Sequence, residues 1–268
     1  MKITVLTLFP DMVGCFLNES IVKRAQEKKL VAVEIVNIRD FAEDSYGTVD
    51  DRPYGGGAGM VLMAKPIVSA IKITKSQFPI SKQITKSKSS NRKQKVVLTS
   101  PRGEVYIQKK AQEYSKLDHL ILIAGHYEGV DERVLKYVDE EVSLGDFVMT
   151  GGEIAAAAIV DSMVRLLPGV LKKDEAVEQE SFFTVSLDQL LDVVGKHPVL
   201  MNLKKKGIKN ITLLEYPHYT RPEEFSKMKA PEVLLSGNHA EIEKWRLQQS
   251  FELTLKKRRD LLERKTIF

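Results

Sequence analysis

At 268 residues and with 43% hydrophobic composition, the chain can bury a sizeable core, either as one large α/β domain or as a main domain with a smaller one. Its longest apolar runs, such as residues 154–160, are far shorter than a membrane span, and the N-terminal segment shows no signal-peptide cleavage pattern. We therefore expect a cytoplasmic protein that does not associate with membranes. The single cysteine, Cys15, excludes an intrachain disulfide and a thiolate metal cage, and we expect a packed, inert thiol on an amphipathic helix.

The net charge of +5 is concentrated in one stretch of the chain. Residues 71–95 hold eight basic side chains and no acidic one, so the rest of the chain is net acidic. The serines in the second half of this stretch are typical of an exposed loop that could contact phosphates. A solvated insertion that maintains solubility explains the same composition equally well.

Hydrophobic periodicity alternates between strand and helix patterns over the first two thirds of the chain. Strands are predicted at residues 2–9, 31–38, 95–100, 119–124 and around Val142. Helices are predicted at residues 11–28, from Lys65 onward, and at 104–114, 130–138 and 154–167. This order of elements predicts an α/β fold with a parallel sheet.

The composition changes after the last of these helices, which is expected to end before Pro168. Residues 171–180 are charged and have no apolar periodicity, so we interpret them as a linker. From about Leu187 the pattern is mostly helical, and the stretch from Pro231 onward predicts a small helical domain.

Two glycine-rich loops that follow predicted strands indicate a binding pocket. Residues 125–129 follow the strand 119–124 directly, at the sheet edge where ligands of α/β proteins usually bind. The second loop, residues 143–153, contains Gly145, Gly151 and Gly152, whose main-chain N–H and C=O groups can meet a small polar ligand. Two such loops facing each other could hold a nucleoside.

A third glycine-rich segment, residues 48–60, does not fit the dinucleotide-binding fingerprint, because no helix opens after its glycines. The charged residues Asp50, Asp51 and Arg52 at its start favour a lid over an inert turn. His126 in the first pocket loop could act as a general base, but a hydrogen-bonding or stacking role is more common for a histidine in such a loop.

Two charged residues have both a structural and a functional interpretation. Asp161 and Arg165 are four residues apart on one predicted helix and could form an ion pair worth ~0.2–0.5 kcal/mol. Alternatively, an arginine beside the pocket loops on an otherwise apolar helix indicates an anionic or electron-rich partner. Glu180 is one of several acids in the charged linker, and its spacing alone does not select it.

Seven motifs follow one another along the chain: TVDDRPYGGGAGM, LTSPRGE, GHYEGVDERV, SLGDFVMTGGE, DSMVRLLPGVL, LLEYPHYTRPE and VLLSGNHAEIEKWR. Together and in this order, they resemble the bacterial tRNA (guanine-N1-)-methyltransferase family TrmD over nearly the whole chain. The resemblance implies an enzyme of the SPOUT class that methylates N1 of the guanosine 3′ of the anticodon with S-adenosylmethionine, which supports reading-frame maintenance. It also implies a parallel sheet with a deep trefoil knot in its C-terminal part, a small all-helical C-terminal domain, and a homodimer with shared active sites.

The resemblance divides the chain and assigns roles to individual residues. Residues 1–171 would form the catalytic domain, 172–210 a linker with an insertion, and 211–268 the tRNA-binding domain. The cofactor would be held by Ser100, Pro101, Gly125, Tyr127, Glu128, Gly129, Leu144, Gly145, Asp146, Phe147, Val148, Met149, Gly151 and Gly152. The tRNA would be contacted by Asp50, Arg52, His218, Tyr219, Arg221, Asn238, His239 and Arg246.

In the same scheme Glu180 would accept the N1 proton, and Arg165 would stabilise the negative charge that develops on the guanine. The family usually has aspartate where Glu180 stands, and many relatives have arginine in place of His126. Magnesium could assist, although no carboxylate cluster marks a metal site. Two other functions remain open: a SPOUT methyltransferase with a different RNA target, and a catalytically inactive RNA-binding relative.

Overall fold

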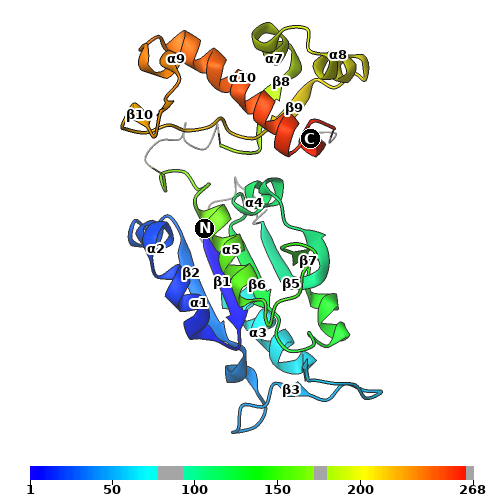
Figure 1. Ribbon diagram of the computed structural model, residues 1–268. Coiled ribbons are helices and arrows are strands. Elements are labelled where there is room, and N and C mark those ends of the chain that lie inside the picture. The colour runs from blue at the N-terminus through cyan, green and yellow to red at the C-terminus, as the bar shows by residue number, and fades with distance from the viewer. Residues whose placement is uncertain (78–92, 172–179, 264–268) are drawn as a thin grey trace, which may run out of the picture. The chain divides into compact units, whose positions relative to one another are not determined.

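The protein is described by a computed structural model that covers residues 1–77, 93–171 and 180–263 (Figure 1). Residues 78–92 of the basic stretch and most of the predicted linker lie outside these residues. The chain divides into two compact units, Met1–Lys172 and Lys173–Phe268. Among the described residues, no helix combines the length and the apolar character that crossing a membrane requires.

The first unit is built on a five-stranded sheet in which every neighbouring pair of strands is parallel. Its strands, in the order in which they lie in the sheet, are β2 (Ala32–Asn37), β1 (Lys2–Thr7), β6 (His119–Ala124), β5 (Gln94–Val105) and β7 (Glu140–Ser143). All six residues of β6 are buried, as expected for a central strand covered on both faces. The predicted parallel sheet is therefore confirmed.

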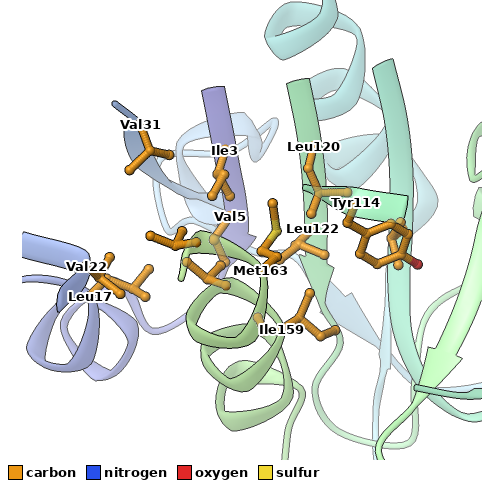
Figure 2. Close-up of a cluster of buried hydrophobic side chains, with 14 of the residues drawn as sticks. Ile3, Val5, Leu17, Val22, Val31, Tyr114, Leu120, Leu122, Ile159 and Met163 are labelled. Atoms are coloured by element: carbon orange, nitrogen blue, oxygen red, sulfur yellow. The ribbon is translucent and has the colours of Figure 1, made fainter. Parts of the chain in front are cut away.

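Helices cover both faces of the sheet because side chains alternate between the faces along each strand. Leu120 and Leu122 pack in one core with α1, α2 and α5 (Figure 2), whereas Ile121 and Ile123 pack in a second core with α3. The first face carries α1 (Pro10–Leu17), α2 (Ser20–Glu27), α4 (Gln108–Tyr114) and α5 (Glu153–Val164). The second carries α3 (Ala64–Gln77) and the 3₁₀ helices η1 (Ile38–Phe41) and η2 (Glu132–Tyr137).

Three details of the sequence-based prediction were wrong. The helix expected at 11–28 is the pair α1 and α2, because the helix breaks after Leu17 and Ser20, at the start of α2, adopts a positive φ of 52°. Cys15 is exposed rather than packed. The helix expected at 104–114 begins only at Gln108, because β5 continues to Val105 alongside β7.

His119 is a fully buried histidine at the start of β6. Its Nε2 lies 2.9 Å from Oγ1 of Thr4, and its Nδ1 lies 2.8 Å from the amide nitrogen of Gln94. Because that amide nitrogen only donates, His119 accepts at Nδ1 and is neutral with its proton on Nε2. Burial, together with the positive charge of Lys2, lowers the pKa of His119 from 6.5 to about 4.

This histidine makes the stability of the first unit depend on pH. The unfolded chain binds the proton of His119 more tightly than the folded chain does. The contribution of neutral His119 to the free energy of unfolding is therefore complete above pH 6.5 and is lost as the pH falls toward 4. We expect the free energy of unfolding to fall by about 3 kcal/mol across that window, from a pKa shift worth ~1.4 kcal/mol per unit. Urea titrations at several pH values would measure it. In the variant His119→Gln, the free energy of unfolding should depend much less on pH between 4 and 6.5. An unchanged dependence would show that His119 is not its cause.

In its described residues, the second unit combines several short helices and the 19-residue helix α10 with two small antiparallel sheets. Its elements are β8 (Phe183–Ser186), α7 (Leu187–Val194), α8 (Pro198–Lys205), β9 (Asn210–Leu213), β10 (Glu224–Phe225), β11 (Met228–Lys229), α9 (Glu232–Leu235), α10 (His239–Lys257) and α11 (Asp260–Glu263). Leu190 and Leu200 pack in one core with Phe251 and Leu262. The unit is therefore not all-helical, and residues 183–210, expected as an insertion in a linker, supply part of its core.

Candidate active site

The topology of the sheet brings the two predicted pocket loops together. β5 lies between β6 and β7, so the loops that leave the carboxyl ends of β6 and β7 meet above the end of β5. A cavity of about 360 Å³ lies between these loops. Both the position of this cavity and the glycine-rich loops around it agree with the pocket that the glycine pattern predicted.

Most of the residues assigned to the cofactor line this cavity. They are Ser100, Pro101, Gly125, Tyr127, Glu128, Gly129, Leu144, Phe147, Val148, Met149, Gly151 and Gly152. Gly145 and Asp146 are not among the lining residues, and Gly145 instead exchanges hydrogen bonds with Oγ of Ser143 at 2.9 and 3.1 Å.

Ten lining residues were not assigned to the cofactor from the sequence. They are Leu98, Thr99, Arg102, His126, Val130, Glu132, Val142, Ser143, Thr150 and Ala155. Most of them directly flank the assigned motifs at the strand ends. Extending the motifs by one or two residues into the adjoining strands would have found Leu98, Thr99, Val142 and Ser143.

Glycines allow the two loops to approach each other at backbone distance. The amide of Gly152 donates to the carbonyl of Gly125 at 2.6 Å, and His126 forms a β-bridge with Gly151. A Cβ at Gly152 would collide with Oγ1 of Thr99 and lie 2.9 Å from the amide nitrogen of Gly125. The cavity wall thus depends on the absence of side chains at these positions.

Behind the first loop lies a buried carboxylate that the sequence did not single out. Glu153 begins α5, where the helix dipole favours negative charge, and its side chain is only 1% exposed. Thr7 Oγ1 donates to its Oε1 at 2.9 Å, and Nδ1 of His126 lies 3.4 Å from its Oε2. The ring of His126 also packs on Phe9, with ring centroids 4.7 Å apart. These contacts support the hydrogen-bonding and stacking role for His126.

The segment 48–60 is joined to the pocket through its return strand. β3 (Asp50–Asp51) pairs with β4 (Val61–Leu62) as a hairpin. Leu62 N donates to Gly129 O at 2.9 Å, and Glu128 N donates to Met60 O at 3.0 Å. The hairpin is therefore fixed beside Glu128, while its tip at Tyr54 is fully exposed.

Arg165 does not lie beside the pocket loops of its own chain, contrary to expectation. α5 begins at the cavity, which Gly152 and Ala155 line, and Arg165 follows its last residue. The 12 residues of α5 separate the two ends by about 18 Å. Glu180 belongs to the second compact unit, where its carbonyl accepts from the amide of Phe183 at 3.0 Å.

Several RNA-contact candidates gather where residues 214–222 meet α10. The ring of Tyr219 lies 6.3 Å from that of Trp245, and the guanidinium of Arg246 lies 4.8 Å from the ring centre of Tyr216. His218 packs on Tyr216 with ring centroids 4.8 Å apart. Alternating aromatic and basic side chains of this kind suit single-stranded RNA.

The remaining candidates lie at exposed or half-buried positions. Asn238 caps α10 by accepting from the amide of Glu241 at 3.4 Å, and His239 is the first residue of that helix. Arg221 and Arg52 are exposed, and Asp50 is half-buried in the hairpin. Within the described parts of the chain, no group of three or more His, Cys, Asp or Glu side chains could hold a metal ion.

Comparison with known proteins decides the family. A sequence model described as "tRNA (Guanine-1)-methyltransferase TrmD" matches residues 1–264. The chain belongs to the TrmD family. A relative from Anoxybacillus flavithermus, named tRNA (guanine-N(1)-)-methyltransferase, is 47% identical over 264 residues, which cover 98% of this chain and 92% of the relative.

Two further relatives carry the same name and similar coverage. The protein from Caldanaerobacter subterraneus is 45% identical over 97% of this chain and 91% of its own length. The protein from Ruminiclostridium cellulolyticum is 44% identical over 98% of this chain and 97% of its own length. The TrmD match thus includes both compact units, with the cavity of the first and the aromatic and basic cluster of the second.

Proposed function

We propose that this chain transfers a methyl group from S-adenosylmethionine to N1 of a guanosine in tRNA, namely the guanosine 3′ of the anticodon. The observation that carries the proposal is the cavity between the two glycine loops, in a chain that belongs to the TrmD family. A methyltransferase of this kind needs a cofactor site, a base for the N1 proton and a surface for RNA.

The cavity fits a small nucleoside cofactor. Its volume of about 360 Å³ falls within the ~300–1,000 Å³ of small-molecule sites. Leu98 and Val130 supply apolar wall for a base, and the backbone of Gly125 and Gly151 supplies hydrogen-bonding groups without side chains in the way. When bound, S-adenosylmethionine supplies an electrophilic methyl group that the deprotonated N1 of guanine accepts.

The chain's own residues must remove the N1 proton and hold the charge that follows. Guanine N1 is a poor nucleophile while it carries a proton, so a base at the site raises the rate. We assign this role to the carboxylate of Glu180. Arg165, with its fixed positive charge, stabilises the negative charge that builds on the guanine as the proton leaves.

Arg165 acts, in this proposal, at the cavity of a second copy of the chain. About 18 Å of helix separates it from the cavity of its own chain, which is too far for direct contact with a substrate there. The first unit also exposes Phe9, Met12 and Phe16 along one side of α1 and Ile154 at the start of α5. An apolar face of this kind marks an interaction surface, and a homodimer with shared active sites would cover it.

Mixed dimers test the sharing of sites. We expect Arg165→Ala and Gly152→Val chains to be inactive as homodimers, because one lacks the arginine and the other lacks the cavity. A heterodimer purified through two different tags keeps one intact site, so it should recover about half of the native turnover per dimer. Recovery of no activity would contradict the shared site, and an active Arg165→Ala homodimer would contradict the role of Arg165.

Other features expected from the resemblance belong to the same proposal. A deep trefoil knot in the C-terminal part of the first unit belongs to the proposal, because the chain is a member of the TrmD family. A tRNA substrate fits a cytoplasmic location. Magnesium could assist in the same proposal, and the described side chains offer no group of three or more His, Cys, Asp or Glu to hold it.

A methyl-transfer assay tests the function directly. The enzyme is incubated with labelled S-adenosylmethionine and tRNA transcripts that carry either guanosine or adenosine 3′ of the anticodon. We expect label only in the guanosine transcript, recovered as N1-methylguanosine after digestion to nucleosides. Label in a ribose or in ribosomal RNA would favour a changed target, and no label with any RNA would favour an inactive RNA-binding relative.

A further inference from the structure

Glu153, the first residue of α5, is a buried carboxylate beside the cofactor cavity. Its neighbours Gly152 and Ala155 line the cavity, but Glu153 itself does not. α5 packs against β1 and β6, so the carboxylate lies inside the first unit (Figure 1). Because burial of a carboxylate is costly unless hydrogen bonds or an opposite charge compensate for it, its contacts indicate what it holds in place.

The two oxygens of this carboxylate contact different segments of the chain. Oε1 accepts a hydrogen bond of 2.9 Å from Oγ1 of Thr7, the last residue of β1. Oε2 lies 3.4 Å from Nδ1 of His126, in the cofactor loop, residues 125–129, which follows β6. Glu153 thus connects the cofactor loop to the start of α5 and to the end of β1.

The second pocket loop leaves room for the contact between His126 and Glu153 because residue 151 is a glycine. A Cβ on Gly151 would lie 2.2 Å from Nδ1 of His126 and 2.3 Å from Oε2 of Glu153. The backbone of Gly151 also forms a β-bridge with His126. Both pocket loops therefore take part in the arrangement that brings the imidazole to the carboxylate.

The residue after His126 has a strained backbone. Tyr127 adopts a positive φ of 60°, a conformation that residues other than glycine keep only where surrounding contacts fix it. Its ring packs edge-on against that of His126, with ring centroids 5.1 Å apart, and both residues line the cofactor cavity. An anchor on His126 is therefore also an anchor for the wall that Tyr127 forms.

We propose that Glu153 is a positioning residue for methyl transfer, which acts through His126 to hold the cofactor loop in the conformation that binds S-adenosylmethionine. The proposal rests on the proposed function, because it takes the cavity to be the cofactor site. Without the contact to Glu153, Tyr127 can leave its strained conformation. The binding conformation is then only a fraction of the free enzyme, and the apparent cofactor affinity falls by that fraction.

Calorimetric titration of full-length variants with S-adenosylmethionine tests this role. Glu153→Leu removes the carboxylate, and His126→Phe removes Nδ1 but keeps an aromatic ring beside Phe9. We expect each substitution to weaken cofactor binding about tenfold, as when a tenth of the free enzyme keeps the binding conformation. The double variant should also lose about tenfold, because both substitutions remove the same contact.

His126→Arg separates this contact from packing in general. The guanidinium of arginine can donate to the Glu153 carboxylate, so this variant should keep most of the cofactor affinity. The same substitution in the Glu153→Leu chain should leave the tenfold loss uncorrected, because no carboxylate is there to accept. A role of Glu153 in stability alone would not produce this difference in affinity.

Glu140→Leu is the matched control in the same unit. Glu140 is another largely buried carboxylate, which accepts hydrogen bonds from Lys110 and Tyr114 and does not line the cofactor cavity. Its loss should lower the thermal midpoint but leave cofactor affinity nearly unchanged. Combined with His126→Phe, it should add no further loss of cofactor affinity.

Two results would overturn the inference. One is a loss of about a hundredfold in the double variant of Glu153 and His126, the product expected of independent residues. The other is an equal loss of cofactor affinity in His126→Arg and His126→Phe, a comparison that suffices if Glu153→Leu does not fold. Failure of the proposed function looks different, because the native protein would then not bind S-adenosylmethionine at all.

Discussion

Replacing Glu180 with glutamine is expected to reduce the rate of methyl transfer by about 10²–10⁴-fold. The amide has nearly the same shape as the carboxylate, but it cannot take the proton from guanine N1. Single-turnover transfer of label to tRNA measures this step without a contribution from product release. Cofactor binding, followed by calorimetry, should be unchanged, because the residues that line the cofactor cavity belong to the other compact unit.

The matched control is Glu180→Asp. Aspartate restores the residue that the family usually has at this position and keeps the carboxylate, so most of the rate should survive despite the shorter side chain. Near-normal turnover in Glu180→Gln would remove Glu180 from the role of base. Loss of cofactor binding in that variant would instead indicate a structural effect.

Replacing Gly152 with alanine is expected to destroy the cofactor cavity. The added Cβ would collide with Oγ1 of Thr99 and come within 2.9 Å of Gly125 N and 3.1 Å of Ala124 Cα. Two of these neighbours are backbone atoms of the adjoining strand and loop, which cannot rotate away. Overpacking of this kind lowers stability by about 1–3 kcal/mol, and we expect at least a tenfold loss in affinity for S-adenosylmethionine. Thermal unfolding and calorimetry measure the two effects separately.

Gly14→Ala provides the control for this substitution. Gly14 lies in α1, and the nearest atom to an added Cβ would be 3.6 Å away, which is ordinary contact. Alanine is the better helix former, so this variant should be as stable as the native chain or up to ~1 kcal/mol more stable. Its cofactor affinity should not change. Normal binding in Gly152→Ala would show that the loops can separate without loss of the cavity.

The sheet and the cofactor loops could be predicted because their signals are local. The apolar run of β6 and the glycines that follow it specify a buried strand and a sharp turn within a few residues. Glycines at the ends of parallel strands converge on one edge of the sheet, whatever the details of the helices between them. The position of the cavity therefore followed from sequence pattern and topology alone.

The features that were missed depend on contacts between distant segments. Glu153 resembles an ordinary residue in the first turn of a helix, and only its contacts with Thr7 and His126 reveal a buried carboxylate. α5 begins directly after the pocket glycine Gly152, yet the length of this helix places Arg165 at its opposite end. Leu190 and Leu200 lie in the stretch that was predicted to be a linker with an insertion. Only the three-dimensional structure shows that they are buried in one core with Phe251.

The hairpin of β3 and β4 has a consequence for how the two substrates influence each other. Met60 and Leu62 on its return side share backbone hydrogen bonds with Glu128, Gly129 and Asp131, in the loop that forms one wall of the cofactor cavity. A cofactor that steadies this loop would slow exchange of the amide hydrogens of Leu62 and Asp131 with solvent, although neither residue touches the cavity. The exposed tip would then adopt a narrower range of positions before any RNA arrives, so occupancy of the first site would prepare the surface for the second ligand.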